Sequence, residues 1–595
     1  SFLFYHNMKS IVKMTSRTLE SLPSVPTKFT NALPCDIYTA KVTESSQTNL
    51  MRTPRPVHQA VYSHVYPETA PDPRLLSLSK PACKDLDLDA NEILSDPHKF
   101  VSVFSGNEIL PDTKPWSLCY AGHQFGFFAG QLGDGRAVSL FESINSKGES
   151  WEIQLKGAGR TPYSRFGDGY AVLRSSIREF LMSEHMHALG VPTTRALALM
   201  ETTRDVYRDD GPRGKQPETG AIVARMSPSW LRFGNFEMFY SRDDMDNVRL
   251  LADYAIDQVV KDTEYGGTGN KYASFFRNVT KSTAKMVAEW QAIGFNHGVM
   301  NTDNMSILGL TMDYGPFQIM DYYNPLYICN HSDEAGRYAY HRQPSVCIFN
   351  LVKLSIPLFE LIGAGDGVDH LVFPSISDET KEGVTDEETL EKYRYEGKTF
   401  VQDLLNNEFK EYFMQHLLAK MRSKIGLSEN TSTQSDMDDV VIPLLDWMTT
   451  YHIDYHRFYR SLSNYKITEE GEDADADNAI TKWLDIRTEE EAQTDPSKEA
   501  LKPWLAIYRH RLLKDKVDND ERKQRMDAVN PRFVLRNSIA EDVIQAFDNE
   551  TDEDEARDIL NACLDACTNP FKDYYEDERI ENWIKSSVPV SNIDI

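Results

Sequence analysis

Two short segments carry the side chains best suited to metal and phosphate chemistry. The first contains His297, Asp303 and Asn304, and the second begins with Asp313. Carboxylate and amide oxygens, completed by the phosphates of a nucleotide, suit Mg²⁺ or Mn²⁺ rather than a metal that takes soft ligands. The two segments therefore predict a site for ATP and a divalent cation, with Asn304 and Asp313 as metal ligands.

The spacing follows the catalytic-loop and metal-loop patterns of protein kinases. In the pattern H-R-D-x-x-x-x-N, an Asp stands two residues after the His and an Asn seven residues after it. His297 and Asn304 keep this register, and Asp313 opens a segment that fits D-F-G, but Val299 stands where the catalytic Asp is expected. The usual acceptor of the substrate proton is missing, so the chain is either an inactive kinase or an enzyme with different chemistry on ATP.

Three upstream features precede these segments in the kinase order. Gly133 and Gly135 precede an apolar run, and glycine lets backbone N–H groups approach phosphate oxygens. Alternating residues up to Lys156 predict a strand that ends in this Lys, and Glu179 on an amphipathic helix is the candidate carboxylate that holds it. Each feature alone is more commonly a plain turn, a solvated Lys or an exposed Glu, but their joint order favours a nucleotide site.

Longer motifs resemble the selenoprotein O family. They occupy residues 120–126, 130–136, 154–159, 161–165, 167–169, 171–180, 297–315 and 329–333. The resemblance runs from about residue 53 over most of the chain. It implies an α+β, protein-kinase-like bilobal fold, with a β-containing N-lobe and a mainly helical C-lobe. It also implies that ATP binds in reverse and that AMP is transferred to Ser, Thr or Tyr hydroxyls of proteins, with release of pyrophosphate.

The same resemblance assigns roles to residues spread along the chain. Binding of the nucleotide and its phosphates would fall to Gly133, Gly135, Arg136, Lys156, Asp168, Gly169, Arg225 and Arg232. Glu179 would hold Lys156, Asn304 and Asp313 would be the metal ligands, and Asp303 would accept the proton.

The arginines favour AMP transfer over phosphoryl transfer. An AMP transferase must stabilise a departing pyrophosphate, and planar guanidinium groups do so through paired, charge-assisted hydrogen bonds. Arg136, Arg225 and Arg232 supply three such groups, although an arbitrary arginine is more commonly part of a surface ion pair. Asp303 is the nearest carboxylate left to act as base, although such a residue could also be a turn or cap residue. A phosphotransferase using Asp303 and an inactive nucleotide-binding scaffold stay open as alternatives.

Length and charge bound the remaining possibilities. The chain has 595 residues, which is more than one hydrophobic core usually contains, so two or more lobes are expected. Its net charge of −27 argues against nucleic-acid binding. No apolar stretch reaches the ~18–20 residues of a membrane span. We expect a transit peptide or disordered tail (1–34), an N-terminal extension (35–115), an N-lobe (116–246) and a helical C-lobe with a C-terminal extension (247–595).

The first residues favour a mitochondrial protein. Residues 1–34 contain Lys9, Lys13, Arg17 and Lys28 but only one acidic residue, Glu20. This composition is typical of a mitochondrial transit peptide, and the family resemblance points the same way.

The cysteines predict no zinc site. The one close pair, Cys563 and Cys567, has no second pair at metal spacing and predicts two core thiols on one helix face. Selenoprotein O proteins typically end in a Cys or selenocysteine that can act in redox control with a Cys at the position of Cys329. The sequence has no Cys after Cys567, so it resembles the fungal or eukaryotic mitochondrial type and puts that control in doubt.

Overall fold

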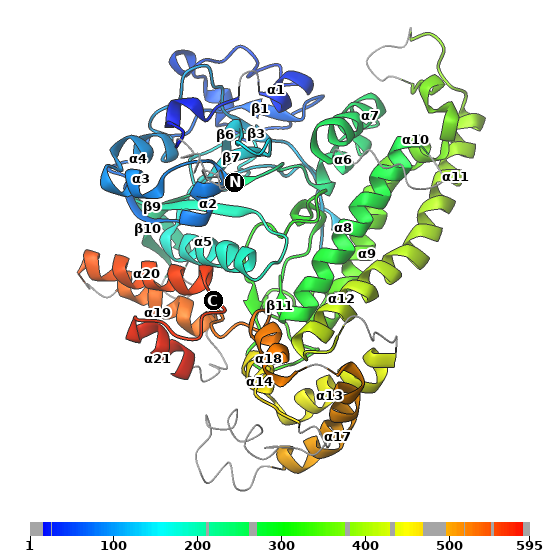
Figure 1. The fold of residues 1–595 in the computed structure, drawn as a ribbon. Coiled ribbons are helices and arrows are strands. Elements are labelled where there is room, and N and C mark those ends of the chain that lie inside the picture. The colour runs from blue at the N-terminus through cyan, green and yellow to red at the C-terminus, as the bar shows by residue number, and fades with distance from the viewer. Residues whose placement is uncertain are drawn as a thin grey trace, which may run out of the picture.

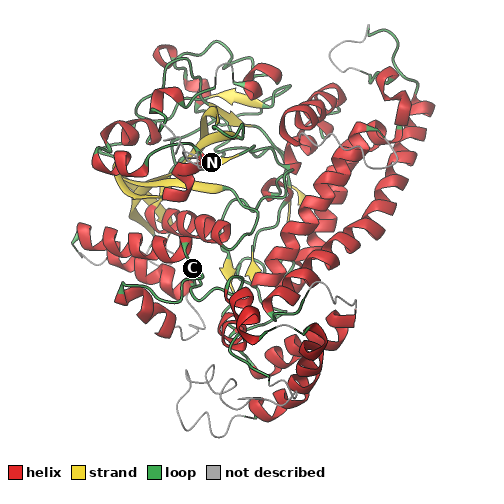
Figure 2. Ribbon diagram, in the orientation of Figure 1, coloured by secondary structure: helices red, strands yellow, loops and turns green. Residues whose placement is uncertain are grey.

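One large antiparallel sheet and a set of long helices make up the fold (Figures 1 and 2). The computed structural model describes residues 16–24, 27–209, 214–260, 270–374, 381–428, 435–467, 496–516, 518–548 and 552–586. The α+β class predicted from the sequence is confirmed.

The sheet has the strand order β1-β3-β6-β7-β10-β9-β2, and β8 pairs with β10. Its strands are β1 (Tyr62–His64), β2 (Arg74–Leu78), β3 (Trp116–Leu118), β6 (Ala137–Ile144), β7 (Ser150–Lys156), β8 (Ala171–Val172), β9 (Arg195–Asp209) and β10 (Lys215–Ser227). Two small sheets pair β4 (His123–Gln124) with β5 (Phe127–Phe128) and β11 (Phe295–Asn296) with β12 (Gln318–Ile319). Strands β1 and β2 lie before residue 116, so this sheet crosses the expected boundary between extension and N-lobe.

Strand β7 shows why the sheet can carry a polar site. Successive side chains of a strand point to opposite faces. Ile153 and Leu155 join an apolar core shared with Phe100 and Phe104. Lys156 lines a cavity on the other face, as the predicted strand ending in Lys requires.

The helices before the catalytic segment are α1 (Lys28–Ala32), α2 (Lys80–Asp85), α3 (Ala90–Ser95), α4 (His98–Phe104), α5 (Leu173–Ala188), α6 (Phe233–Tyr240), α7 (Met245–Tyr254) and α8 (Lys271–Ile293). Those after it are α9 (Gln343–Ser355), α10 (Phe359–Gly363), α11 (Glu387–Leu404), α12 (Lys410–Lys424), α13 (Ile442–Tyr451), α14 (Tyr455–Leu462), α17 (Ser497–Asp515), α18 (Asn519–Asp527), α19 (Asn537–Asp548), α20 (Glu553–Thr568) and α21 (Glu578–Ser586). The apolar periodicity of the sequence predicts helices over residues 345–365, 396–425, 438–465 and 479–515. The first three stretches are mostly helical, and so is the described part of the fourth; its residues 479–495 lie outside the described residues.

Helix α8 ends where the catalytic segment must begin. Asn270 caps its first turn by accepting hydrogen bonds from the backbone of Tyr272 and Ala273. At the other end Gly294 takes a left-handed conformation (φ +71°), which glycine adopts without steric cost and which commonly ends a helix. Strand β11 and the segment from His297 follow at once.

The C-terminal helices return to the sheet. Figure 1 shows α19, α20 and α21 beside α5, and α20 contacts both α5 and β2. Cys563 and Cys567 are buried in α20, as the helix-face prediction requires. Helices α12, α13, α14, α17 and α18 enclose a second apolar core.

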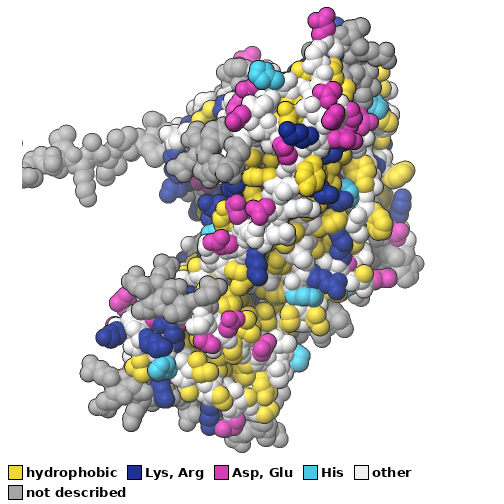
Figure 3. Space-filling model, turned by 90° about the vertical axis from the view of Figure 1, so that its right-hand side faces the viewer, with side chains coloured by type: hydrophobic (Ala, Val, Ile, Leu, Met, Phe, Trp, Pro, Cys, Tyr) yellow, Lys and Arg dark blue, Asp and Glu magenta, His cyan; other side chains and the backbone are white. Residues whose placement is uncertain are grey.

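The helical side of the molecule carries charges of both signs among apolar side chains (Figure 3). One helical run within the described residues, Tyr340–Gly363, is long and apolar enough to cross a membrane, and 61% of its most apolar 18-residue window is buried inside the structure. A buried core helix has the same length and composition, so this run is weak evidence of a membrane span.

Candidate active site

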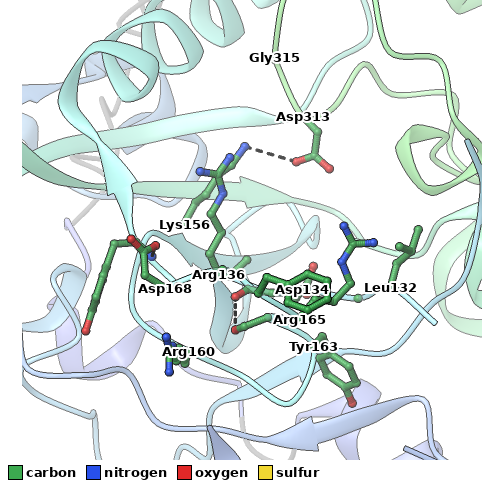
Figure 4. Close-up of a pocket in the computed structure, with 18 of the residues that line it drawn as sticks. Leu132, Asp134, Arg136, Lys156, Arg160, Tyr163, Arg165, Asp168, Asp313 and Gly315 are labelled. Carbon is green, nitrogen blue, oxygen red and sulfur yellow. Dashed lines mark hydrogen bonds and ion pairs between the residues drawn. The ribbon is translucent and has the colours of Figure 1, made fainter. Parts of the chain in front are cut away.

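A cavity of about 960 Å³ lies between the sheet and the loops that follow α8. Of the predicted site residues, all except Glu179 line it: Gly133, Gly135, Arg136, Lys156, Asp168, Gly169, Arg225, Arg232, Asp303, Asn304 and Asp313. Figure 4 shows Lys156 from β7 and Asp313 from a loop pointing toward each other. Residues up to 180 positions apart in the chain are thus brought to one space.

The glycine-rich turn before β6 is packed too closely for side chains. A Cβ on Gly133 would lie 2.6 Å from Cγ of Tyr163, and one on Gly135 would lie 2.9 Å from the backbone oxygen of that residue. Gly133 also has φ +122°, which L side chains rarely adopt. Between them, Asp134 turns inward and accepts hydrogen bonds from the backbone of Leu118 (3.0 Å) and from Gln154 Nε2 (3.2 Å). Asp134 therefore anchors the turn to the sheet, a role that the sequence analysis did not predict.

Lys156 and Glu179 form the predicted pair. Lys156 Nζ lies 2.5 Å from Oε2 of Glu179, which projects from α5, and both side chains are largely buried. Burial lowers the pKa of Lys156, and the charge of Glu179 opposes that effect. The other carboxylate oxygen of Glu179 accepts a hydrogen bond from Arg225 Nη1 (3.0 Å). Glu179 therefore orients two cations rather than one.

Arg225 and Arg232 converge on Asp313. Arg225 Nη1 lies 2.7 Å from Oδ1 of Asp313, and Arg232 Nη1 pairs with Oδ2. Burial would raise the pKa of Asp313, but Arg232, Arg225 and Lys156 hold it well below its usual range. Burial would likewise lower the pKa of both guanidinium groups, but carboxylates, Asp313 foremost, raise it. These groups are charged at neutral pH.

Each of these arginines is further fixed from behind. Arg225 donates two hydrogen bonds to Oε1 of Gln154 (3.0 and 2.7 Å) and lies over the ring of Trp230. Arg232 lies over the ring of Tyr120 and donates to the backbone oxygen of Asp303 (2.6 Å). Such preorganised donors can stabilise charge without rearranging during a reaction.

Asp303 is a buried carboxylate held at the cavity wall. Its Oδ2 accepts a hydrogen bond from Nε2 of Gln124 (3.3 Å), while Oδ1 is buried with no partner among the described residues. Burial raises the pKa of Asp303 to about 6, with Arg232 acting in the opposite direction. A carboxylate with a pKa near the working pH and a free oxygen suits a general base.

The donor set fits a divalent cation bound together with phosphates. Asn304 donates from Nδ2 to the backbone oxygen of Val299 (2.9 Å), which leaves its amide oxygen for another ligand. Asp313 supplies a carboxylate, and His297 Nε2 binds the backbone oxygen of Met312 (2.9 Å), which ties the two loops together. Among the described residues no group of three His, Cys, Asp or Glu side chains could hold a metal alone. Mg²⁺ commonly binds through one or two protein oxygens and substrate phosphates, so this sparse set is suitable.

A family model agrees with this geometry. The model described as "Protein adenylyltransferase SelO" matches residues 48–563. The chain belongs to the SelO family. The SelO family consists of protein adenylyltransferases, so the chain is a nucleotidyltransferase, and the resemblance noted in the sequence is confirmed.

Individual relatives match the SelO chain over most of its length. A "Protein nucleotidyltransferase YdiU" of Thiobacillus denitrificans is 40% identical over 490 residues, which cover 82% of this chain and 87% of the relative. One from Myxococcus xanthus is 37% identical and covers 87% of this chain and 92% of the relative. "Protein adenylyltransferase SelO, mitochondrial" of Schizosaccharomyces pombe is 38% identical, covering 89% and 91%.

Three further residues of the cavity differ in their surroundings. Asp168 lines the cavity but is paired with Arg208 through hydrogen bonds of 2.6 and 3.2 Å. Gly169 packs so tightly that a Cβ there would lie 2.2 Å from the backbone of Gly159. Arg136 is exposed at the cavity. Asp168 thus orients a cation from β9 in addition to lining the space.

The sequence reasoning missed the residues that support the others. They are Gly122, Gln124, Asp134, Gln154 and Arg208. A weak indication existed for two of them: Asp134 stands between the two glycines, and Gln154 has the same parity as Lys156 on β7, so both face the cavity side. For the others, only the packing reveals the partner.

Proposed function

We propose that this SelO protein transfers AMP from ATP to a Ser, Thr or Tyr hydroxyl of another protein and releases pyrophosphate. The supporting observation is the buried cluster in which Arg225 and Arg232 flank Asp313 beside Asp303. A kinase site uses one Lys and its metal ions for the phosphates. Two additional buried guanidinium groups suit a leaving group with the charge of pyrophosphate.

In the proposed reaction, ATP lies with its outer phosphates at Lys156, Arg225 and Arg232 and its α-phosphate toward Asp303. The acceptor hydroxyl transfers its proton to the carboxylate of Asp303 as its oxygen bonds to the α-phosphorus. The bond from the α-phosphorus to the bridging oxygen breaks, and pyrophosphate leaves with that electron pair. A divalent cation at Asn304 and Asp313, Mg²⁺ or Mn²⁺, would neutralise phosphate charge when bound.

We also propose that the architecture is a variant of the bilobal protein-kinase fold. Lys156 on β7 and Glu179 on α5 would correspond to the N-lobe (116–246), and the segment after α8 to the helical C-lobe (247–595). The order of these elements along the chain and their meeting at one cavity support the assignment. A complex with a non-hydrolysable ATP analogue would test the reversed binding of ATP, since the kinase orientation puts the γ-phosphate beside Asp303.

We also propose that the protein is located in mitochondria. The basic, Ser- and Thr-containing composition of residues 1–34 supports it, as does the name of the Schizosaccharomyces pombe relative. Fluorescence microscopy of the full chain with a C-terminal tag tests it, with a version lacking residues 1–15 as control, because Leu22, Phe29 and Leu33 further on are buried in the apolar cores. Loss of mitochondrial signal only in the shortened version supports a targeting role.

The reaction itself is tested with ATP labelled at either the α- or the γ-phosphorus. The protein is incubated with Mg²⁺, a mixture of acceptor proteins and one labelled ATP. Protein-bound label from the α-position supports AMP transfer. Label from the γ-position would mean that the chain is a phosphotransferase, and absence of label from both would favour the inactive scaffold. Asp313→Ala serves as the control for metal-dependent transfer.

A further inference from the structure

Arg178 is the neighbour of Glu179 on α5, but it faces away from Lys156. Its Nη1 donates to Oδ1 of Asn537 (3.1 Å), and its Nη2 donates to the backbone oxygen of Phe317 (3.1 Å). The guanidinium group also lies 4.6 Å from the centre of the Phe317 ring. One buried side chain therefore contacts the loop that follows Asp313 and the first residue of the C-terminal helix α19.

Asn537 completes the connection. While its Oδ1 accepts from Arg178, its Nδ2 donates to Oε1 of Gln318 (2.9 Å). Gln318 lies in β12 and pairs with Asn296, the residue before His297. The oxygen and the nitrogen of the Asn537 side-chain amide thus contact α5 and β12, respectively.

The charge of Arg178 is not explained by stability. Within the described part of the chain no carboxylate forms an ion pair with it, and burial lowers its pKa. A buried cation that is satisfied only by neutral acceptors costs free energy relative to an apolar side chain of similar size. Its geometry, with two donors aimed at two different elements, is what an apolar residue cannot supply.

A second contact fixes the far end of the same helix. His185 on α5 accepts a hydrogen bond at Nε2 from the backbone of Leu535 (3.3 Å), and its Nδ1 binds the backbone oxygen of Cys567 (3.1 Å). With Arg178 near one end and His185 near the other, α5 is attached to the C-terminal segment at two points. Movement of α5 as a whole away from β7 would require these contacts to open.

We propose that Arg178 and Asn537 are positioning residues that hold α5 and the metal loop in a fixed relation. Through them the C-terminal helix α19 sets the distance between Glu179 and Asp313, the two carboxylates that Arg225 bridges. This inference rests on the proposed function, because the geometry it preserves is that of the ATP and metal site.

The test compares Arg178→Ala, Arg178→Lys, Asn537→Ala and the double variant with the full chain. Arg174→Ala is the matched control, because Arg174 lies one turn earlier on α5 and forms an ion pair with Glu218 in which its own side chain is exposed. Misplacement of catalytic groups by a remote change can cost on the order of 10²-fold in rate. We expect Arg178→Ala to lower kcat roughly 10- to 100-fold and to raise the Mg²⁺ concentration that gives half-maximal activity.

The conservative variant and the double variant distinguish positioning from mere stability. Arg178→Lys keeps the charge but cannot reach both acceptors, so it should restore little activity. The double variant should be little worse than Arg178→Ala, because the two residues act as a unit. A lowered Tm with unchanged kcat, KM for ATP and Mg²⁺ dependence in Arg178→Ala and Asn537→Ala would overturn the proposal, as would additive losses.

Two measurements do not require AMP transfer. One is calorimetric binding of Mg²⁺ with a non-hydrolysable ATP analogue, and the other is amide hydrogen exchange of residues 313–319. Weaker binding and faster exchange in the Arg178 and Asn537 variants support positioning even if the wild-type chain transfers no AMP, in which case only the proposed function fails. Unchanged binding and exchange in both variants would sink the positioning role. Asn537 is only partly buried, so its variant remains informative if Arg178→Ala does not fold.

Discussion

The α-carbon of Gly122 lies directly against the carboxylate of Asp303. A Cβ at residue 122 would be 2.5 Å from Oδ1 and 3.0 Å from Cβ of Asp303. The backbone of Gly122 is not in the left-handed region, so close approach rather than conformation requires glycine here. The segment that contains Gly122 therefore sets the position of the proposed base.

Gly122→Ala should displace Asp303 and lower kcat. The methyl group would meet Oδ1 and displace the carboxylate of the proposed base, so we expect a loss of roughly 10²-fold with a small change in KM for ATP. Steady-state kinetics measures both. Gly148→Ala is a control for general destabilisation, since it strains a turn (φ +79°) but meets no atom within 4 Å. Equal kcat values for Gly122→Ala and the wild type would contradict the inference that Gly122 sets the position of the proposed base.

The pH dependence of kcat/KM should rise through the pKa of Asp303. Burial raises this pKa to about 6, so the active, deprotonated form grows as the pH increases toward 7. A bound divalent cation would lower the pKa of Asp303, so the midpoint should lie at or below about 6. Gln124→Leu removes a hydrogen bond to the charged form, so it should move the midpoint to higher pH. A pH profile unchanged by Gln124→Leu would argue that Asp303 does not titrate in this limb.

Glu179→Ala and Lys156→Ala should each abolish most activity. Because Glu179 holds both Lys156 and Arg225, its loss frees two cations, so it should be at least as harmful as the loss of Lys156. Residues that act as a unit show non-additive losses, so the double variant should be little worse than Glu179→Ala. Label transfer from ATP and Tm are measured for each. Fully additive losses would mean that the two side chains act independently.

Arg232→Lys should rescue Arg232→Ala poorly. Nη1 of the guanidinium group contacts the carboxylate of Asp313 and the backbone oxygen of Asp303, while Nη2 lies 3.8 Å from Asp134 and the planar group lies over the ring of Tyr120. A compact ammonium group cannot reproduce this planar arrangement. Loss of one such preorganised donor typically costs about 2.7–4 kcal/mol of barrier, or roughly 10²–10³ in rate. Single-turnover rates at saturating ATP test this. Near-wild-type rates for Arg232→Lys would show that charge alone suffices.

Lys424→Met should stabilise the fold at neutral pH. Lys424 is buried over the rings of Tyr455 and Tyr459, and within the described residues no carboxylate pairs with it. Burial first, and then the charge of Lys420, lowers its pKa to about 7. Below that pH the folded state bears the full cost of a buried charge. Between pH 7 and the unfolded pKa near 10.4, the unfolded chain binds more protons, so stability rises with pH by roughly 5 kcal/mol at most.

Urea unfolding at several pH values measures this effect. The free energy of unfolding of Lys424→Met should exceed that of the wild type most at pH 6–7, and the difference should shrink as the pH rises toward 10. Lys410→Met, at the exposed start of α12, is the control and should show no such trend. A difference that does not depend on pH would mean that folding does not lower the pKa of Lys424.

The features of the site that depend on neighbouring residues could be predicted from the sequence. Alternation along β7 predicted that Lys156 ends a strand, helical periodicity placed Glu179 on a helix, and the spacing of His297, Asn304 and Asp313 predicted two loops with metal ligands. These features depend on backbone conformation and on neighbours within a few residues. A single chain therefore contains enough information to predict them.

The contacts between distant side chains are visible only in the tertiary structure. That Arg225 and Arg232 both bind Asp313, that Gln124 holds Asp303, and that the sheet includes β1 and β2 could not be read from spacing. Such contacts join residues far apart in the chain, and their geometry is set by how the sheet, α5 and the loops pack together. Arg178 is the clearest case, because its sequence neighbour Glu179 indicated the site whereas its partner Asn537 lies on a helix near the other end of the chain.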